Sequence, residues 1–250
     1  MKTVLITGCS SGFGVEIARH FLDQGWKVIA TMRTPRTDGL PQSPNLRVLQ
    51  LDVTDAQSIE RAVHEAGPID VLVNNAGIGL LSVFEATPVQ AYRDIFETNT
   101  IGLMALTRAV LPQFRQRKAG VIVNVASTVT LKALPLLPVY TASKAAVVAF
   151  TESLALELQP LNIRASVVLP GLAPDTQFGA NAMPRLNQDV PEEYAPILAN
   201  VLAGFQNYSG PITRASQVAE AVWRSATDAS TPWRIPAGDD AVEHFAAQAK

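Results

Sequence analysis

The chain alternates short, continuously apolar runs with longer amphipathic segments, and this alternation limits the folds open to it. Six runs, several rich in β-branched residues, lie at 2–7, 26–32, 46–51, 69–74, 120–127 and 163–169. Strands buried on both faces of a parallel sheet show such continuous apolarity. Amphipathic segments typical of crossover helices lie near 13–24, 55–66, 88–117 and 139–159. A final helix and strand are expected at about 215–228 and 232–235. The pattern predicts an α/β fold: a doubly wound parallel sheet with helices on both faces.

One region, 172–213, departs from this rhythm. No change of composition marks a second domain, so we expect 1–250 to form a single domain. The region contains five prolines and little periodicity. Ligands bind beyond the carboxyl ends of the strands in such sheets, so an irregular segment there is more often a lid or substrate loop than a linker. Its apolar side chains would suit a hydrophobic substrate or would pack on one another: Phe178, Met183, Leu186, Tyr194, Ile197, Leu198, Phe205 and Tyr208.

Composition excludes several classes of partner. The formal net charge is −2 and no block of basic residues occurs, which argues against nucleic acid or an anionic membrane as the main partner. The single cysteine, Cys9, excludes an internal disulfide and fits a reducing compartment. The three histidines are scattered, so no metal site is expected. We expect a cytoplasmic protein without a signal peptide or membrane span.

A glycine-rich turn follows the first predicted strand. The segment TGCSSGFG spans 7–14 and leads directly into a helical pattern. Glycines allow a tight turn and a close approach of the backbone to a pyrophosphate, and a helix start favours an anion. An ordinary strand–turn–helix loop uses similar residues, but the position at the first crossover favours a dinucleotide. The expected contacts are Gly8, Ser10, Ser11, Gly12, Phe13 and Gly14.

Tyr140 and Lys144 are spaced to share one face of a helix. An ammonium about 4 Å from the phenol would favour the phenolate by about 4 kcal/mol at an effective dielectric of about 20. That energy equals roughly three pKa units, which would bring the phenol from about 10 towards neutrality. The pair therefore predicts an acid–base catalyst, although the spacing alone occurs by chance in many helices. Ser127 closes the fifth predicted strand and can donate to a substrate carbonyl, or it is a strand-end turn serine.

Together these motifs resemble the short-chain dehydrogenase/reductase family in its single-domain, Rossmann-fold form. The resemblance covers nearly the whole chain. It rests on TGCSSGFG, Asp52-Val53, NNAG at 74–77, Asn99 in TNTIG, Ser127, Tyr140 with Lys144, and Leu169-Pro170-Gly171. TGCSSGFG together with ATMR at 30–33 is similar to the branch that acts on steroids, retinoids and other lipophilic carbonyls.

The resemblance implies roles for four catalytic residues. Ser127 and Tyr140 would bind the substrate oxygen, with Tyr140 as proton donor or acceptor. Lys144 would acidify the phenol and also bond the nicotinamide ribose. The backbone carbonyl of Asn99 would hold a water that links to the Lys144 ammonium.

It also implies contacts to the adenosine half of a cofactor. The Asp52 carboxylate would accept from the adenine amino group, and Val53 would add a backbone contact. Asn75, Ala76 and Gly77 would pass close to the adenine ribose. Without the resemblance, Asp52 reads equally as a helix-capping or strand-end residue, and Asn75 as one that bonds the backbone at a strand end.

Pro170 and Gly171 would shape the loop beside the nicotinamide. Relatives commonly carry a threonine four residues after this glycine, where this chain has Asp175. Either a one-residue insertion lets Thr176 bond the carboxamide or the contact is lost, and we favour the insertion.

The second predicted strand indicates the cofactor. An acidic residue there selects NAD, and an arginine accommodates the 2′-phosphate of NADP. Met32 stands where NAD-preferring relatives carry aspartate, Arg33 follows it, and Arg36 is close by. A guanidinium can hold the 2′-phosphate by two hydrogen bonds, and Ser10 and Ser11 can add donors. We predict NADP, with NAD less favoured.

The sequence thus predicts an NADP-dependent oxidoreductase that interconverts an alcohol and its carbonyl, for example a carbonyl reductase. An alternative is an NADP-sensing regulator on the same fold, which would typically lack the Tyr140 or Lys144 that this chain keeps. An isomerase or lyase is a third reading. The predicted helices at 88–117 and 139–159 are apolar around most of their circumference, so we expect a homodimer or homotetramer through them.

Overall fold

A single parallel sheet organises the protein. The computed structural model describes residues 1–176 and 190–248. Within them, the strands follow the order β3-β2-β1-β4-β5-β6-β7 and every neighbouring pair is parallel. Their bounds are β1 Thr3–Thr7, β2 Lys27–Met32, β3 Leu46–Gln50, β4 Val71–Asn74, β5 Gly120–Val125, β6 Ile163–Pro170 and β7 Arg234–Ala237. The order reverses between β1 and β4, so the ligand-binding crevice is expected at their carboxyl ends.

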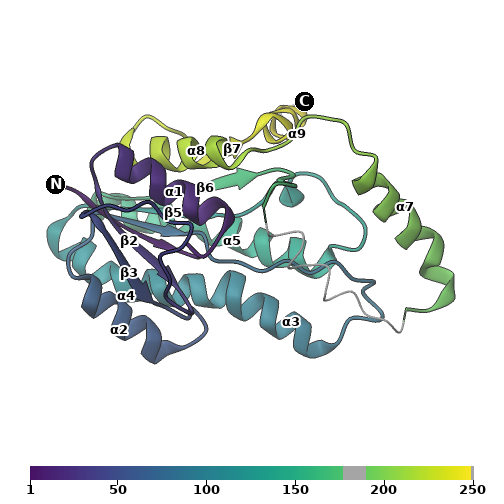
Figure 1. Ribbon diagram of the computed structural model, residues 1–250, viewed down its shortest axis with the longest axis horizontal. Coiled ribbons are helices and arrows are strands. Elements are labelled where there is room, and N and C mark those ends of the chain that lie inside the picture. Colours follow the sequence, from purple (N-terminus) through teal and green to yellow (C-terminus); the bar gives the residue numbers. More distant parts are fainter. Residues whose placement is uncertain (177–189, 249–250) are drawn as a thin grey trace.

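Helices cover both faces of the sheet. Their bounds are α1 Gly12–Asp23, α2 Ala56–Ala66, α3 Val89–Phe96, α4 Gly102–Arg117, α5 Pro138–Leu158, α7 Ala195–Gln206, α8 Ala215–Thr227 and α9 Asp239–Ala247. Helices α1 and α8 pack on one face, and α2, α4 and α5 pack on the other (Figure 1). The predicted doubly wound α/β fold is therefore confirmed.

The apolar runs of the central strands are continuous because both faces of these strands are buried. In β1, Val4 and Ile6 belong to the core beneath α1 and α8, whereas Leu5 belongs to the core beneath α2, α4 and α5. All three side chains are fully buried. Strand β4 repeats this division, with Val73 on the first side and Leu72 on the second. These strands therefore lack the alternation of apolar and polar side chains that a half-exposed strand shows.

The structure divides the helix expected at 88–117. Helix α3 ends at Phe96, a π-helical turn spans Glu97–Ile101, and α4 then continues to Arg117. A π-turn inserts one extra residue into the helical ladder, and such turns are frequent at functional sites. Here the insertion contains Asn99.

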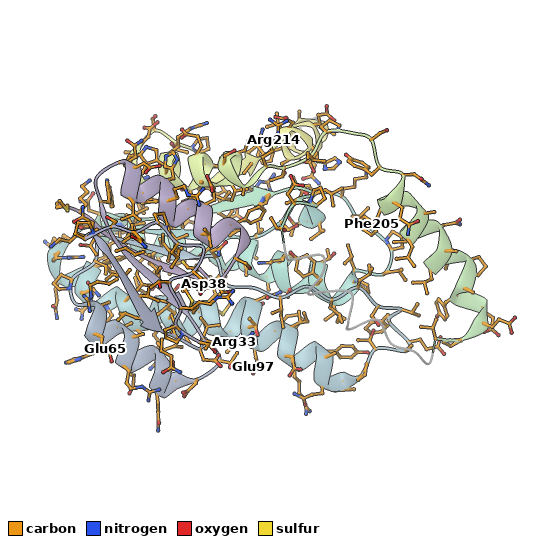
Figure 2. The ribbon with its side chains drawn as sticks, viewed as in Figure 1. Arg33, Asp38, Glu65, Glu97, Phe205 and Arg214 are labelled. Carbon is orange, nitrogen blue, oxygen red and sulfur yellow. The ribbon has the colours of Figure 1, made fainter. Side chains whose placement is uncertain are left out.

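The region 172–213 was predicted to be irregular, but the structure places a helix in it. Helix α7 lies within it, and Pro196 sits in its first turn, where proline is tolerated. Its apolar side packs on a small cluster that includes Leu81 and Val83. Figure 2 shows Phe205, on α7, at the far end of the molecule from Glu65 on α2. Three of the predicted lid residues lie outside the described residues: Phe178, Met183 and Leu186.

Candidate active site

The glycine turn between β1 and α1 is closely packed against the chain after β4. A Cβ on Gly14 would lie 2.2 Å from the Gly8 carbonyl oxygen, so only glycine lets α1 start this close to β1. Gly8 has a φ of +74°, and a Cβ there would lie 2.9 Å from the Ala76 Cα. Gly12 begins α1 with a φ of +56°. The turn therefore brings a helix N-terminus to the carboxyl edge of the sheet, where an anion is favoured.

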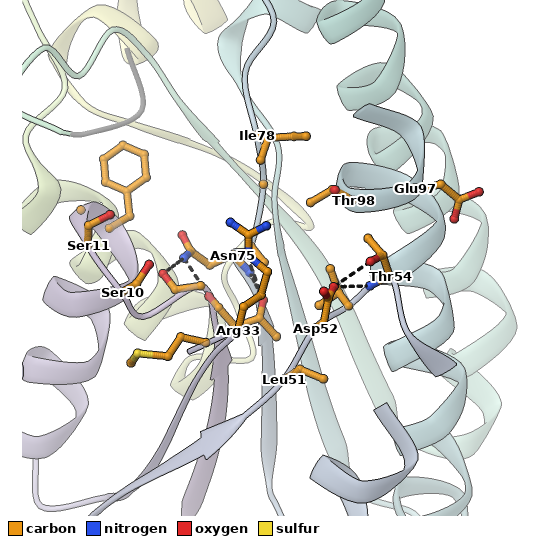
Figure 3. A pocket seen from close by; sticks show the side chains of 18 of the residues that line it. Ser10, Ser11, Arg33, Leu51, Asp52, Thr54, Asn75, Ile78, Glu97 and Thr98 are labelled. Atoms are coloured by element: carbon orange, nitrogen blue, oxygen red, sulfur yellow. Dashed lines mark hydrogen bonds between the residues drawn. The ribbon is translucent and has the colours of Figure 1, made fainter. Parts of the chain in front are cut away.

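A cavity of about 550 Å³ opens above this turn (Figure 3). It spans the carboxyl ends of β1, β2, β3 and β4, where the sheet order reverses. The predicted cofactor residues that line it are Gly8, Ser10, Ser11, Gly12, Phe13, Arg33, Asp52, Val53, Asn75, Ala76, Gly77 and Thr176. Of the other described residues predicted to bind cofactor, Gly14, Tyr140, Lys144, Pro170 and Gly171 do not line it.

Thr7 holds the two central strands together at the cavity. Its hydroxyl oxygen accepts from the backbone N–H groups of Asn75 at 3.0 Å and Ala76 at 2.9 Å. The Asn75 side-chain amide donates in return to the Thr7 carbonyl at 2.8 Å. Thr7 was not predicted as a site residue, and its place directly before the first glycine was the available signal. Asn75 thus makes the strand-end bonds left open by its sequence and also lines the cavity.

Asp52 makes a strand-end contact and also lies at the cavity wall. One carboxylate oxygen accepts from the Thr54 backbone N–H at 2.9 Å and from its hydroxyl at 2.7 Å, which is a strand-end turn. The residue also lines the cavity, as do Asp94 and Glu97. Because three carboxylates line the cavity, an anionic ligand needs positive charge from elsewhere.

Two arginines supply that charge beside the glycine turn. Arg33 lines the cavity, and Figure 3 shows its side chain between Ser10 and Asp52. Arg36 donates from Nη2 to the Ser10 carbonyl at 2.9 Å and pairs with Asp38 at 3.7 Å. Arg33 is therefore positioned to contact a ligand, whereas Arg36 supports the turn. Met32, before them, is buried and places no carboxylate in the cavity.

The π-helical turn places Asn99 against the chain that follows β4. Its side chain is fully buried; Oδ1 accepts from the Ile78 backbone N–H at 2.8 Å, and Nδ2 donates to the Ile78 carbonyl at 2.9 Å. Nδ2 also donates to the Ser143 hydroxyl on α5 at 3.1 Å. Ser143 in turn donates to the Tyr140 carbonyl at 2.7 Å. Asn99 therefore connects the nucleotide side of the site to α5.

Tyr140 and Lys144 lie one turn apart on α5, both buried beneath the same edge of the sheet. Lys144 Nζ donates to the Val125 carbonyl at the end of β5 at 2.9 Å. A Cβ on Gly77, which lines the cavity, would lie 3.4 Å from Lys144 Nζ and 3.3 Å from Asn99 Oδ1. The ammonium therefore lies directly behind the cavity wall.

Ser127 faces Tyr140 from the end of β5. The two side chains are hydrogen-bonded, and Ser127 is also nearly buried. Its hydroxyl oxygen accepts from the Val129 backbone N–H at 3.3 Å, capping the short 3₁₀ helix Thr128–Thr130. The turn contact left open by the sequence is therefore present, and the same side chain faces Tyr140.

The acid–base balance of the pair differs from the sequence expectation. Burial raises the pKa of the Tyr140 phenol above its usual value, and the hydrogen bond with Ser127 opposes that rise. Burial also lowers the pKa of the Lys144 ammonium to about 8. The cost of burying the phenolate therefore outweighs the lowering of the phenol pKa that the sequence predicts from Lys144. At neutral pH, Tyr140 therefore holds its proton while Lys144 remains mostly charged.

The loop after β6 reaches the opposite side of the cavity. Pro170 ends the strand, and Gly171 begins a turn that brings Thr176 to the wall. A Cβ on Gly12 would lie 3.4 Å from the Thr176 Cβ. Thr176, rather than Asp175, therefore lies at the cavity wall.

Comparison with known proteins identifies the family. The family model for short chain dehydrogenases matches residues 2–186. The chain belongs to the short-chain dehydrogenase family. Retinol dehydrogenase 8 of Bos taurus is 41% identical over 184 residues, a match that covers 68% of this chain and 58% of the relative. The chain thus spans about three fifths of the length of this curated relative.

Solved short-chain dehydrogenases match almost the whole chain. One from Streptomyces avermitilis has a TM-score of 0.86 and 32% identity, covering 99% of this chain and 92% of its own. A serine dehydrogenase in its closed form, complexed with NADP⁺, has a TM-score of 0.78 and 31% identity, with 95% of each chain covered. The resemblance inferred from the motifs is confirmed at the level of the family.

Two other classes of site find no support in the parts of the chain that the structure describes. Across residues 1–176 and 190–248, no cluster of histidine, cysteine, aspartate or glutamate side chains is arranged to hold a metal ion. No helix within those residues is both long and apolar enough to cross a bilayer. Cys9 is buried, and burial raises the pKa of its thiol to about 12, which makes it a poor nucleophile.

Proposed function

We propose that this short-chain dehydrogenase is an NADP-dependent oxidoreductase that interconverts an alcohol and its carbonyl. The observation that carries the proposal is that Tyr140 is hydrogen-bonded to Ser127 and lies one helical turn from Lys144, whose ammonium lies beside Gly77. Gly77 belongs to the wall of a cavity built on a glycine turn. A proton-transfer group and a nucleotide-binding cavity thus share one wall, as hydride transfer requires.

Tyr140 supplies the proton in the direction of carbonyl reduction. Because burial raises the pKa of its phenol, the hydroxyl is protonated at neutral pH and available to the substrate oxygen. Ser127 donates a second hydrogen bond to the same oxygen and stabilises its developing negative charge. The nicotinamide, when bound, supplies or accepts the hydride.

Lys144 stabilises the phenolate that remains after proton transfer. Its ammonium donates to the Val125 carbonyl at 2.9 Å. Lys144 Nζ would lie 3.4 Å from a Cβ on Gly77, at the cavity wall. This position also suits a hydrogen bond to the nicotinamide ribose. Asn99 orients the Ile78 segment and α5 around it, and its own carbonyl would hold the water that links Lys144 to solvent.

The cavity fits a dinucleotide with a 2′-phosphate. Gly8 and Gly14 let α1 start close to β1, so the N-terminus of the helix can receive a pyrophosphate at the carboxyl edge of the sheet. Arg33 would hold the 2′-phosphate, and Asp52 and Val53 would contact the adenine. The NADP⁺ complex of the related serine dehydrogenase supports NADP as the cofactor.

A lipophilic substrate fits the described part of α7 and its surroundings. The helix has no fully buried residue, and Ile197, Phe205 and Tyr208, in and just after it, are each more than two fifths exposed. Retinol dehydrogenase 8 acts, by its name, on an apolar alcohol, whereas the related serine dehydrogenase acts on a small polar one. The apolar character of α7 favours the first kind of substrate.

We also propose a homodimer or homotetramer through α4 and α5. Leu156 on α5 is 70% exposed, and Ile101, just before α4, is 47% exposed. Burying such side chains against a second copy would remove apolar area from water. Sedimentation of the purified protein tests this, and a monomer at all concentrations would contradict it.

The test of the function is turnover by the purified chain with a graded panel of aldehydes and ketones. Oxidation of NADPH is followed by its absorbance, and NADPH binding is measured separately by fluorescence titration. The proposal predicts NADPH binding and turnover of apolar carbonyls. Binding without turnover of any carbonyl or alcohol would favour the alternative, an NADP-sensing protein on the same fold.

A further inference from the structure

The two ends of the segment 172–213 are fastened to each other at the edge of the site. The backbone N–H of Thr213 donates to the Leu172 carbonyl at 2.7 Å. The N–H of Gly171 donates to the Thr213 hydroxyl at 2.9 Å, and that hydroxyl lies 3.0 Å from the Ala237 carbonyl, to which it can donate. The segment therefore leaves the sheet and returns to it at a single point, next to the end of β6.

One buried carboxylate completes this junction. Asp240 is 2% exposed and lies in the first turn of α9, where the helix dipole stabilises a negative charge. Its Oδ2 accepts from the Leu172 backbone N–H at 2.6 Å, and its Oδ1 accepts from the Thr213 hydroxyl at 2.7 Å. A single side chain thus binds both the outgoing and the returning chain.

Two glycines make room for the junction. A Cβ on Gly171 would lie 2.0 Å from Asp240 Oδ2, so any larger residue would displace the carboxylate. A Cβ on Gly238 would lie 1.9 Å from the Thr213 hydroxyl oxygen, and Gly238 has a φ of +114°. The backbone φ of Gly171 is not in the left-handed region. Glycine is therefore required at this position by the close approach of the Asp240 carboxylate and not by the backbone conformation.

We propose that Asp240 and Thr213 are positioning residues for the nicotinamide end of the cofactor site. The inference rests on the proposed function. The chain that they hold at Gly171 and Leu172 continues to Thr176, which lies against Gly12 at the cavity wall. Fixing the base of this chain fixes the cavity wall on the β6 side, away from Arg33 and Asp52, which follow β2 and β3. Loss of the junction should therefore weaken contacts to the nicotinamide half and spare those to the adenosine half.

Thr213→Val is the most direct perturbation, because valine keeps the shape and removes only the hydroxyl. The Gly171 N–H and one oxygen of Asp240 then lose a partner. We expect NADPH to bind about tenfold more weakly or worse, which corresponds to the loss of one hydrogen bond to a charged group. We expect kcat to fall by up to about 100-fold, the effect of a reacting group displaced by about 1 Å.

Conservative variants should keep the hydrogen bonds of the junction. Thr213→Ser keeps the hydroxyl and should behave like the wild type. In Asp240→Asn, the amide oxygen can still accept from Leu172, and the amide N–H can donate to Thr213, whose own hydrogen then goes to Ala237. Asp239→Asn is the matched control, because Asp239 is the neighbouring, exposed carboxylate and bonds Gln217 instead.

The experiment compares two probes on each variant at a temperature well below its measured unfolding midpoint. The first is NADPH, and the second is 2′-phospho-ADP-ribose, which lacks the nicotinamide. We expect Thr213→Val to weaken NADPH binding and leave 2′-phospho-ADP-ribose binding within about twofold of wild type. If Thr213→Val does not fold, Gly171→Ala replaces it, because its Cβ displaces the carboxylate without removing a hydrogen-bonding group.

Each outcome decides the inference. Equal binding of NADPH by the wild type and the perturbing variant would overturn it. Equal weakening of both probes would overturn it too, since that result indicates general loosening of the fold. A wild type that binds NADPH but turns over no carbonyl would contradict the proposed function alone, because the two-probe comparison would still test the junction. A wild type that binds neither probe would contradict both.

Discussion

Replacement of Arg33 by alanine should remove the preference for NADPH over NADH while leaving the use of NADH intact. Arg33 follows the buried Met32 at the end of β2 and lines the cavity beside Ser10. No other cation lines the described part of that cavity, whereas Asp52 and two further carboxylates do. The discrimination between the two cofactors should therefore depend chiefly on this one guanidinium.

The size of the expected loss in NADPH preference follows from the exposure of Arg33. Two hydrogen bonds to a phosphate would each contribute about 1.5–3 kcal/mol if they were buried. Arg33 is exposed, so each falls towards the ~0.2–1 kcal/mol of solvent-screened pairs. A total of about 2 kcal/mol is reasonable, which is a factor of about 30 at 1.4 kcal/mol per tenfold.

The assay is kcat/KM for NADPH and for NADH in the wild type, Arg33→Ala and Arg36→Ala. Arg33→Ala should lower the NADPH/NADH ratio about 30-fold, with NADH unchanged within about twofold, and salt should shrink the difference. Arg36→Ala should lower kcat/KM for NADPH and for NADH by the same factor, because Arg36 donates to the Ser10 carbonyl of the glycine turn. An unchanged ratio in Arg33→Ala, or a ratio that falls only in Arg36→Ala, would refute this placement of the 2′-phosphate.

Three further predictions concern the rest of the site. Lys144→Ala should weaken NADPH binding about tenfold and lower kcat about 100-fold, since the ammonium serves both binding and catalysis. Fluorescence titration measures the binding and turnover measures kcat, and a variant that loses only one of the two would contradict the dual role. The kcat for reduction should fall as pH rises through about 8, where Lys144 loses its charge, whereas oxidation should rise with pH because the Tyr140 phenol must ionise; parallel profiles would contradict this. Gly14→Ala should lower the free energy of unfolding by about 1–3 kcal/mol or more through the contact with Gly8, whereas Gly204→Ala, with open space around it, should not; denaturant melts compare them.

The sheet and its flanking helices were largely predictable because the signal lies in each segment separately. A strand buried on both faces needs an apolar side chain at every position, as Val4, Leu5 and Ile6 show. The order of strands was not predictable in the same way. It depends on which run pairs with which, for example β1 with β4, and that information is not contained in either run.

The candidate site was predictable where one residue type performs the task locally. The glycine turn and the Tyr140–Lys144 spacing are of this kind. Contacts that reach across the fold were missed: Thr7 bonds Asn75, Asn99 bonds Ser143, and Asp240 bonds Thr213. Their partners are distant in sequence, so no local pattern reveals them. Asn99 itself was predicted as a site residue, but only through its backbone carbonyl.

The pKa of Tyr140 was mispredicted for a related reason. Spacing indicates that a cation is near the phenol, but it does not show how deeply the phenol is buried. Desolvation opposes ionisation of Tyr140 and outweighs the effect expected from Lys144. Helix α7 was missed because prolines surround its sequence and one of them lies in its first turn, where proline is tolerated.

The most direct test of the account is Tyr140→Phe, with NADPH binding and carbonyl reduction measured on the same preparation. The ring and its packing remain, and only the hydroxyl that faces Ser127 is lost. We predict NADPH binding within about twofold of wild type and a kcat lowered by about 10²–10⁴-fold, the usual contribution of general acid catalysis. Reduction at the wild-type rate in this variant would contradict the assignment of Tyr140 as the proton donor.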